Sequence, residues 1–236
     1  MERLQKVMAH AGIASRRKCE QLILDGHVTV NGELVTELGT KVGKKDKVEV
    51  DGVPVIQEEH VYYLFYKPRG VITAVKDDKK RKVVNDYFDD IKERVYPVGR
   101  LDYDTSGLLI MTNDGALAQK LMHPKHQIDK TYVAKVEGIA NKHNLKPVVY
   151  GMKIDGYKVA PARYEIISTD QDKQTSIVAL TIHEGRYHQV KKMFEKCGLP
   201  VKKLKREIYG PLTLKGLKPG ERRLLTPKEV QLLKNL

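Results

Sequence analysis

The sequence has no tryptophan, only three phenylalanines and only two cysteines among 236 residues. Cys19 and Cys197 are too few for a disulfide framework and do not show the paired spacing of a zinc site. No apolar run approaches the roughly 18 residues that a membrane-spanning helix requires. The start, MERLQKVMAHAG, lacks the apolar segment of a secretory signal. We therefore expect a cytoplasmic protein without a membrane partner.

Motifs for common cofactors and metals are also missing. There is no GxGxxG, no P-loop and no GxSxG nucleophile elbow. The stretch DYDTSG at 102–107 matches the start of a calcium loop, but the twelfth position is Asn113 instead of glutamate. His183 and His188 lie five residues apart, whereas zinc-binding helices place two histidines four apart. The sequence thus predicts neither a metal nor a cofactor.

Positive charge is abundant and unevenly distributed. The chain has 43 Lys and Arg against 30 Asp and Glu, a net charge of +13. Residues 60–236 carry 34 cationic against 20 acidic side chains, whereas residues 1–59 carry 9 against 10. Clustered cations gain affinity for nucleic acids by releasing counterions from phosphates. We expect a polyanionic partner, bound mainly by the second part of the chain.

Residues 1–58 are predicted to form a small separate domain. Apolar side chains at positions 4, 7, 8 and 11 share one helical face, and Ser15 is placed to cap a second helix that ends near residue 25. Short β-branched runs follow, joined by Asn31-Gly32, a pair suited to a tight hairpin turn. The polar QEEH at 57–60 indicates the boundary.

Residues 60–236 are predicted to form a larger α+β domain. Strand patterns such as VYYLFY and KTYVAKVEG alternate with helical ones, among them a helix from Gln189 to Cys197 that Gly198 ends. This alternation favours a large mixed sheet in which most strands are antiparallel.

One stretch, GRLDYDTSGLLIMTNDG at 99–115, places three acids around an apolar run in a basic chain. At least one of these acids must lie next to the core. A carboxylate at such a junction can attack or stabilise the C1′ of a sugar, and a nucleobase is a good leaving group. The alternative is a structural role, in which Asp102 caps a turn or pairs with Arg100.

The same residues carry a family resemblance. The stretch just quoted, with KPRG at 67–70, KTY at 130–132 and EGRYHQVKKMF at 184–194, resembles the signatures of bacterial ribosomal pseudouridine synthases of the RsuA/RluB type. Residues 1–55 are similar to the S4 RNA-binding module of those enzymes. The resemblance implies an S4-like domain, a pseudouridine synthase domain, and isomerisation of a uridine in ribosomal RNA without a cofactor.

The resemblance also implies three catalytic residues. Asp102 corresponds to the catalytic aspartate, which either attacks C1′ or helps to form a glycal by removing the C2′ proton. Tyr132 corresponds to the tyrosine that stacks on the base and assists removal of the C5 proton. Lys191 corresponds to the cation that pairs with the catalytic aspartate.

Further residues are expected to contact the substrate. Val190 matches the apolar contact beneath the base, and Arg186 is a second basic candidate. Arg100 is expected to hold the RNA backbone or to help extrude the target nucleotide, because a base in a helix must be flipped to expose its sugar bond. Lys67 is expected to brace the wall of the site and to contact a phosphate. The structural alternatives are that Val190 and Tyr132 are core residues and that Lys191 is one of many surface lysines.

The expected RNA contacts of the first domain are two groups of cations, one at a helix start and one in a turn: Arg16, Arg17, Lys18, Lys44 and Lys45. We expect a monomer that acts on ribosomal RNA or on an assembling ribosomal subunit, with 23S rRNA favoured. The alternatives are a 16S rRNA synthase of the RsuA type, a tRNA-directed synthase, and a catalytically silent S4-domain assembly factor.

Overall fold

The structure is a computed structural model that describes residues 1–236. The chain forms two compact units. The first unit comprises residues 1–61 together with the short segments 91–95 and 113–115. The second comprises the remaining residues. No helix in either unit has the length and apolar character needed to cross a membrane.

The first unit combines two helices with short strands, as the sequence predicts. Its helices are α1 (Leu4–His10) and α2 (Arg16–Leu24). A four-stranded sheet has the order β3-β2-β5-β6, and β1 pairs with β4. The strands are β1 (Glu2–Arg3), β2 (Val28–Val30), β3 (Glu33–Leu34), β4 (Lys41–Val42), β5 (Val48–Val50) and β6 (Val53–Pro54).

Local chemistry explains the ends of these elements. The Ser15 hydroxyl caps α2 by accepting a hydrogen bond from the Lys18 backbone N–H at 3.3 Å. Asn31 and Gly32 both adopt positive φ, 53° and 86°, which is the geometry of the predicted hairpin turn between β2 and β3. The apolar helix faces pack on the sheet in a core of seven buried residues: Leu4, Met8, Cys19, Ile23, Val28, Val42 and Val48.

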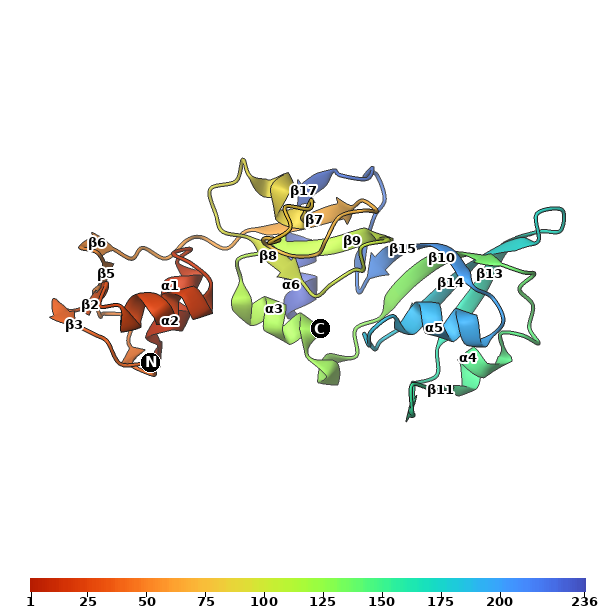
Figure 1. The fold of residues 1–236 in the computed structure, drawn as a ribbon, viewed down its shortest axis with the longest axis horizontal. Coiled ribbons are helices and arrows are strands. Elements are labelled where there is room, and N and C mark those ends of the chain that lie inside the picture. The colour runs from red at the N-terminus through yellow and green to blue at the C-terminus, as the bar shows by residue number, and fades with distance from the viewer. The chain divides into compact units, whose positions relative to one another are not determined.

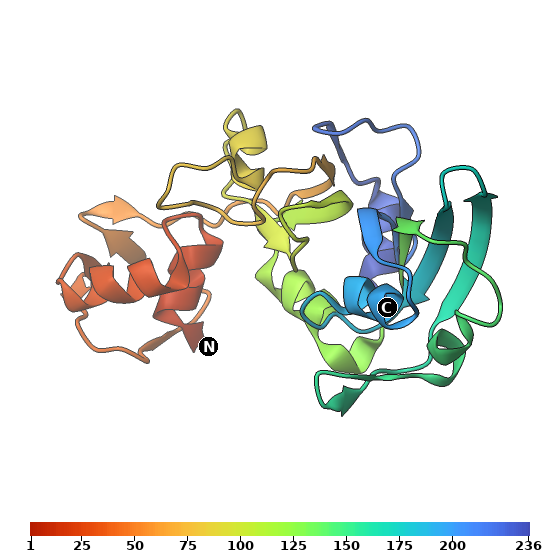
Figure 2. The same cartoon turned by 45° about the vertical axis from the view of Figure 1, so that its right-hand side comes forward.

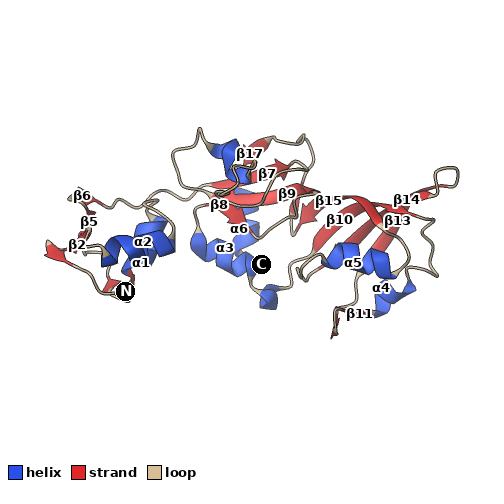
Figure 3. Ribbon diagram, in the orientation of Figure 1, coloured by secondary structure: helices blue, strands red, loops and turns tan.

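The second unit is built on a nine-stranded sheet, seen as a continuous red band in Figure 3. Its main order is β13-β14-β10-β15-β9-β7-β17, with β16 paired to β15 and β8 to β9. The pair β9–β15 is parallel and the others are antiparallel, which confirms the predicted mixed, mostly antiparallel sheet. The strands are β7 (Tyr62–Lys67), β8 (Tyr96–Val98), β9 (Thr105–Thr112), β10 (Lys130–Glu137), β13 (Arg163–Asp170), β14 (Thr175–Ile182), β15 (Val201–Tyr209), β16 (Leu212–Thr213) and β17 (Arg222–Leu224).

Four helices of the second unit lie along one face of this sheet, below it in Figure 1 and on the same side in the turned view of Figure 2. They are α3 (Gly115–Met122), α4 (Lys146–Tyr150), α5 (Gln189–Lys196) and α6 (Pro227–Lys234). The shorter elements are η1 (Val84–Phe88), η2 (Pro124–His126) and the hairpin of β11 (Lys153–Ile154) and β12 (Tyr157–Lys158).

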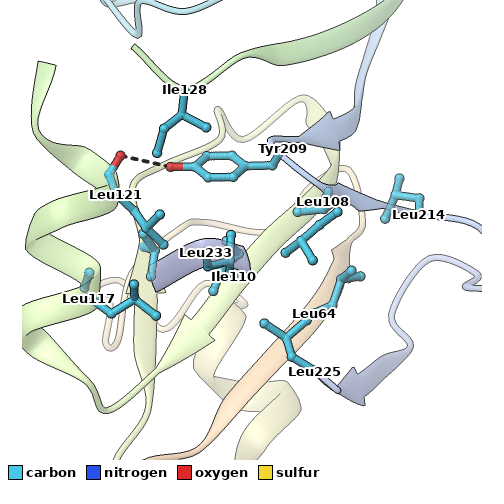
Figure 4. Close-up of a cluster of buried hydrophobic side chains, with 13 residues drawn as sticks. Leu64, Leu108, Ile110, Leu117, Leu121, Ile128, Tyr209, Leu214, Leu225 and Leu233 are labelled. Carbon is cyan, nitrogen blue, oxygen red and sulfur yellow. Dashed lines mark hydrogen bonds between the residues drawn. The ribbon is translucent and has the colours of Figure 1, made fainter. Parts of the chain in front are cut away.

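The core beneath β7 and β9 is closed by α3 and α6 (Figure 4). Leu64, Leu108 and Ile110 from the strands pack with Leu117 of α3 and Leu233 of α6. The Tyr209 hydroxyl donates a hydrogen bond to the Leu121 carbonyl at 3.1 Å, which anchors the end of β15 to α3. This packing holds the start of β9, and the loop before it, in a defined place.

Candidate active site

The GRLD segment forms the loop between β8 and β9. The Thr73 hydroxyl donates to the Leu101 carbonyl at 2.7 Å and accepts from the Leu101 N–H at 3.2 Å. The Asp102 carbonyl accepts from the Thr105 N–H at 3.0 Å, and the Tyr103 carbonyl accepts from Gly70 at 2.7 Å. The backbone on both sides of Asp102 is therefore held, while its carboxylate stays about one-third exposed, at 32%.

Two cationic or titratable side chains from the region of α5 contact the Asp102 carboxylate. Lys191, on the first turn of α5, places its Nζ 3.0 Å from Asp102 Oδ2. The same Nζ lies 2.6 Å from Asp104 Oδ1, so two acids share one ammonium. His188, which precedes α5, lies with Nε2 3.4 Å from Asp102 Oδ1. The structure thus brings Lys191 and Asp102 together across 89 residues of chain.

Hydrogen bonds within this group favour the charged forms of Asp104 and Lys191. The hydrogen bond from Lys191 lowers the pKa of Asp104 below its ordinary value. Burial alone would lower the pKa of Lys191, but hydrogen bonds to Asp104 and Asp102 outweigh it and raise that pKa. Lys191 therefore stays an ammonium at neutral pH and supplies a fixed positive charge beside Asp102.

Lys67 does not fit the expected contact with a phosphate. Its side chain is fully buried, and its ammonium donates to the carbonyls of Pro68, Asp102 and Thr105 at 3.0, 3.0 and 2.7 Å. All three of its protons are therefore used inside the protein. The assignment as a substrate-binding residue is corrected: Lys67 braces the backbone of the Asp102 loop from below, and only that part of the expectation agrees with its position.

Asp102 opens into a cavity of about 850 Å³. Its floor is the helical face of the sheet, and its sides are the end of α3 with η2, the loop 183–188 and the start of α5. Tyr132, Val190, Lys191, Arg100 and Arg186 all line it. Tyr132 and Val190 are largely buried, whereas Arg100 and Arg186 are exposed at the rim.

The loop 183–188 is held by buried polar contacts. Lys130 donates to the carbonyls of His183 and Glu184 at 3.2 and 3.4 Å, and burial lowers the pKa of Lys130 to about 8. Gln189 donates to the Glu184 carboxylate at 2.8 Å and accepts from the Arg186 N–H at 3.2 Å. His188 adopts a positive φ of 52°, an uncommon conformation that clusters at functional sites.

The cationic groups of the first unit are exposed. Arg16, Arg17 and Lys18 occupy the first turn of α2, which contains no acidic residue. Cations at a helix N-terminus oppose the helix dipole, so this arrangement costs folding stability and favours an anionic partner. Lys44 and Lys45 are exposed in the turn between β4 and β5.

Sequence reasoning missed five residues that border the cavity or contact its acids: Asp104, Thr105, Lys130, His188 and Arg206. Asp104 and His188 lie inside the quoted motifs, and their nearness to Asp102 and Lys191 was the available signal. Arg206 lies between the apolar residues Leu204 and Tyr209 on β15. Only the register of the sheet shows that it lies on the same face as the cavity residue Tyr132.

Comparison with known proteins shows the family of the chain. The RNA pseudouridylate synthase family matches residues 61–196, and the S4 domain matches residues 2–55. The "Ribosomal large subunit pseudouridine synthase B" of Bacillus subtilis is 60% identical over 236 residues, which cover all of this chain and 97% of that protein. An "Uncharacterized RNA pseudouridine synthase" of Aquifex aeolicus is 43% identical over 97% of this chain and 92% of that protein.

A solved structure shows the same architecture. The "Crystal structure of pseudouridylate synthase" is 30% identical, with a TM-score of 0.70, and covers 99% of this chain and all of that one. The match spans both units of the chain. The family match over residues 61–196 covers more than half of the chain. The chain belongs to the RNA pseudouridylate synthases and carries an N-terminal S4 domain.

Proposed function

We propose that this enzyme isomerises a specific uridine of 23S ribosomal RNA to pseudouridine, with Asp102 as the catalytic carboxylate. The observation that carries the proposal is the Asp102 carboxylate, paired with Lys191 at 3.0 Å and open to a cavity that Tyr132 also lines. The choice of the large subunit is supported by the name of the Bacillus subtilis relative that is 60% identical.

The reaction is balanced without an oxidant or an energy source. The C1′–N1 bond of uridine breaks, the uracil turns, and a C1′–C5 bond forms; C5 loses a proton and N1 gains one. A charged Asp102 can act by either expected route, as a nucleophile at C1′ or as a base toward C2′. In both routes Lys191 pairs with the carboxylate and orients it.

The other cavity residues divide the remaining work. Tyr132 lies on the floor, where its ring can stack on the flipped base and its hydroxyl can reach the C5 proton. Val190 provides an apolar contact to the base. Arg100 makes no hydrogen bond or ion pair and is exposed at the rim, where it can hold a phosphate or fill the space that the flipped base leaves. Arg186 lies over the ring of Tyr157 at 4.1 Å, which orients it at the same rim.

We further propose that the S4-like domain, residues 1–58, docks on folded RNA through Arg16, Arg17, Lys18, Lys44 and Lys45, and that residues 60–236 carry the chemistry. These five cations are exposed, and the first turn of α2 contains no acid; both observations support a role in RNA binding. We expect the enzyme to work as a monomer in the cytoplasm, on free ribosomal RNA or on an assembling subunit.

The test is tritium release from 23S and 16S transcripts labelled at C5 of uridine. Wild type is compared with Asp102→Asn and with Asp172→Asn, which makes the same chemical change in the exposed β13–β14 turn. We expect release from the 23S transcript by wild type and by Asp172→Asn, and none by Asp102→Asn.

Other results separate the parts of the proposal. Release from 16S alone would overturn the choice of subunit, and undiminished release by Asp102→Asn would overturn the catalytic assignment. If neither transcript is modified, large-subunit assembly intermediates are tested next. Binding without release there as well would overturn the proposed function in favour of a silent assembly factor.

A further inference from the structure

The floor of the cavity contains two polar groups that have no partner in the protein. Arg206 is 3% exposed and Thr105 is 2% exposed. One guanidinium nitrogen, Arg206 Nη2, and the Thr105 hydroxyl are both buried without a hydrogen bond. A buried polar group left unpaired destabilises the fold, so two among the residues that line one cavity call for an explanation.

The sheet register puts both residues on the same face of the sheet as Tyr132. On neighbouring strands, Tyr132 of β10 faces Arg206 of β15, and Leu204 of β15 faces Thr105 of β9. Side chains two residues apart on a strand share a face, so Arg206 and Leu204 point to the same side. All four residues line the cavity. Thr105 is also three residues from Asp102, whose carbonyl accepts the Thr105 N–H.

The rest of each residue is fixed. Arg206 Nε donates to the Leu108 carbonyl at 2.9 Å, and its guanidinium lies 5.1 Å from the centre of the Tyr209 ring. The Thr105 carbonyl accepts from Lys67, and its N–H donates to Asp102. These contacts use the backbone of Thr105 and one side of the guanidinium, and they leave Nη2 and the hydroxyl for another molecule.

Building on the proposed function, we propose that Arg206 and Thr105 read the edge of the flipped uracil. A guanidinium only donates, so Nη2 pairs with a uracil carbonyl oxygen; a threonine hydroxyl can accept, so Thr105 pairs with the N3–H beside it. When that oxygen is O4, cytosine presents its amino group there, which is a donor and leaves Nη2 unsatisfied; the Thr105 hydroxyl can turn and donate to the unprotonated N3, so the guanidinium carries the discrimination. The site therefore selects uracil over cytosine.

The same contact assists the reaction. When the C1′–N1 bond breaks, the released uracil carries negative charge that spreads onto its carbonyl oxygens. A fixed guanidinium at one of these oxygens stabilises that charge without any rearrangement of the site.

Thr105→Val provides the first test, because valine keeps the shape and removes only the hydroxyl. In the RNA-free enzyme this change removes an unpaired buried group, so the melting temperature should stay the same or rise. The kcat/KM for the 23S transcript should fall about tenfold, the effect of losing one hydrogen bond to substrate.

Thr131→Val is the matched control, since the Thr131 hydroxyl pairs with that of Thr181 at 2.8 Å. This control should lower the melting temperature slightly and leave kcat/KM unchanged. A loss of activity without a loss of stability separates a contact with substrate from a contact that only holds the fold.

Arg206→Met provides the second test, with Arg206→Lys as a variant that keeps the charge. Short RNAs carry the mapped target as uridine, 2-thiouridine or 4-thiouridine, because sulfur is the weaker acceptor. Wild type should lose about tenfold or more in kcat/KM with one of the two thio analogues. Arg206→Met should have a lower activity with uridine and less than a twofold difference among the three RNAs.

Several outcomes would overturn the assignment. For Thr105, they are kcat/KM within twofold of wild type, or a melting temperature that falls together with activity. For Arg206, they are an unchanged thio effect in Arg206→Met, or equal use of all three RNAs by wild type. If wild type does not modify the uridine RNA, the proposed function fails instead, so the two failures can be told apart.

Discussion

At the scale of single residues, the main feature of the site is that two carboxylates, those of Asp102 and Asp104, share the single ammonium of Lys191. The motif resemblance points to Asp102 and Lys191, because both lie in contiguous signatures, and the structure brings the two side chains together. It could not identify the burial of Lys67, since that depends on how the carbonyls of Asp102 and Thr105, 35 and 38 residues away, enclose its ammonium together with that of Pro68. It also missed Arg206, whose place in the cavity follows from strand register.

Replacing Lys191 should impair catalysis more than RNA binding. In Lys191→Met the two carboxylates lose their common cation, and a hydrogen bond to a charged group of about 1.5–3 kcal/mol disappears. We expect kcat to fall about 10- to 100-fold with little change in KM, and Lys191→Arg to recover part of it. Lys192→Met is the matched control, because Lys192 pairs with Asp155 outside the cavity. An equal loss in both variants, measured by tritium release, would argue against the pairing role.

Lys67 should make stability depend on pH in the alkaline range. Burial lowers its pKa in the folded protein to about 8, from an ordinary value of 10.5. Between these two pH values the unfolded chain binds more protons than the folded one, so the contribution of Lys67 to the free energy of unfolding rises with pH. Urea denaturation from pH 7 to pH 10 should show a flatter pH dependence in Lys67→Met than in wild type or in the exposed control Lys79→Met. Parallel curves for all three would contradict the inferred burial of charge.

At the scale of elements, the parallel pair β9–β15 creates the floor of the cavity. The sequence predicts β9 from the apolar run GLLIMT, but we did not predict β15 from it, and it contains no local signal for a parallel pairing between segments about a hundred residues apart. The conformation of the loop 183–188 could not be predicted from the sequence either. Its residues were noted for their chemistry, whereas the contacts that hold it come from Lys130 on another strand.

Gly107 is where β9 approaches β15 most closely. It has a φ of 121°, and a Cβ there would lie 2.2 Å from the Arg206 carbonyl oxygen. Gly107→Ala should therefore separate the two strands and lower the free energy of unfolding by about 3 kcal/mol. Gly185→Ala is the control, because no atom lies within 4 Å of its Cβ position and its φ is not positive. Chemical denaturation checks the prediction, and equal stability of the two variants would contradict it.

At the scale of the whole molecule, the fold class and family could be recognised from sequence because the motifs span both units. The exact division could not, since the segments 91–95 and 113–115 join the first unit while lying far along the chain. The distribution of charge can be counted from the sequence, and it predicts that residues 60–236 supply most of the attraction to RNA.

Full-length Arg16→Ala/Arg17→Ala/Lys18→Ala tests how the first unit contributes. If each cation contacts one phosphate, the slope of log affinity against log salt concentration should become smaller in magnitude by about 2. The kcat at saturating RNA should stay the same, because the chemistry is assigned to the second unit. Filter binding of the 23S transcript at several salt concentrations measures the slope. An unchanged slope would remove these three residues from the RNA interface.

The pairing of β9 with β15 also sets the order in which the enzyme can mature during synthesis. Asp102 leaves the ribosome about a hundred residues before the strand that completes its surroundings, and contacts between distant segments form late in folding. The first unit consists mainly of residues 1–61, so most of it is available to fold while the catalytic half is still being translated. A nascent chain arrested before residue 201 would carry Asp102 and Lys191 without Arg206 or Tyr209, and would gain its reactive cavity only as translation ends.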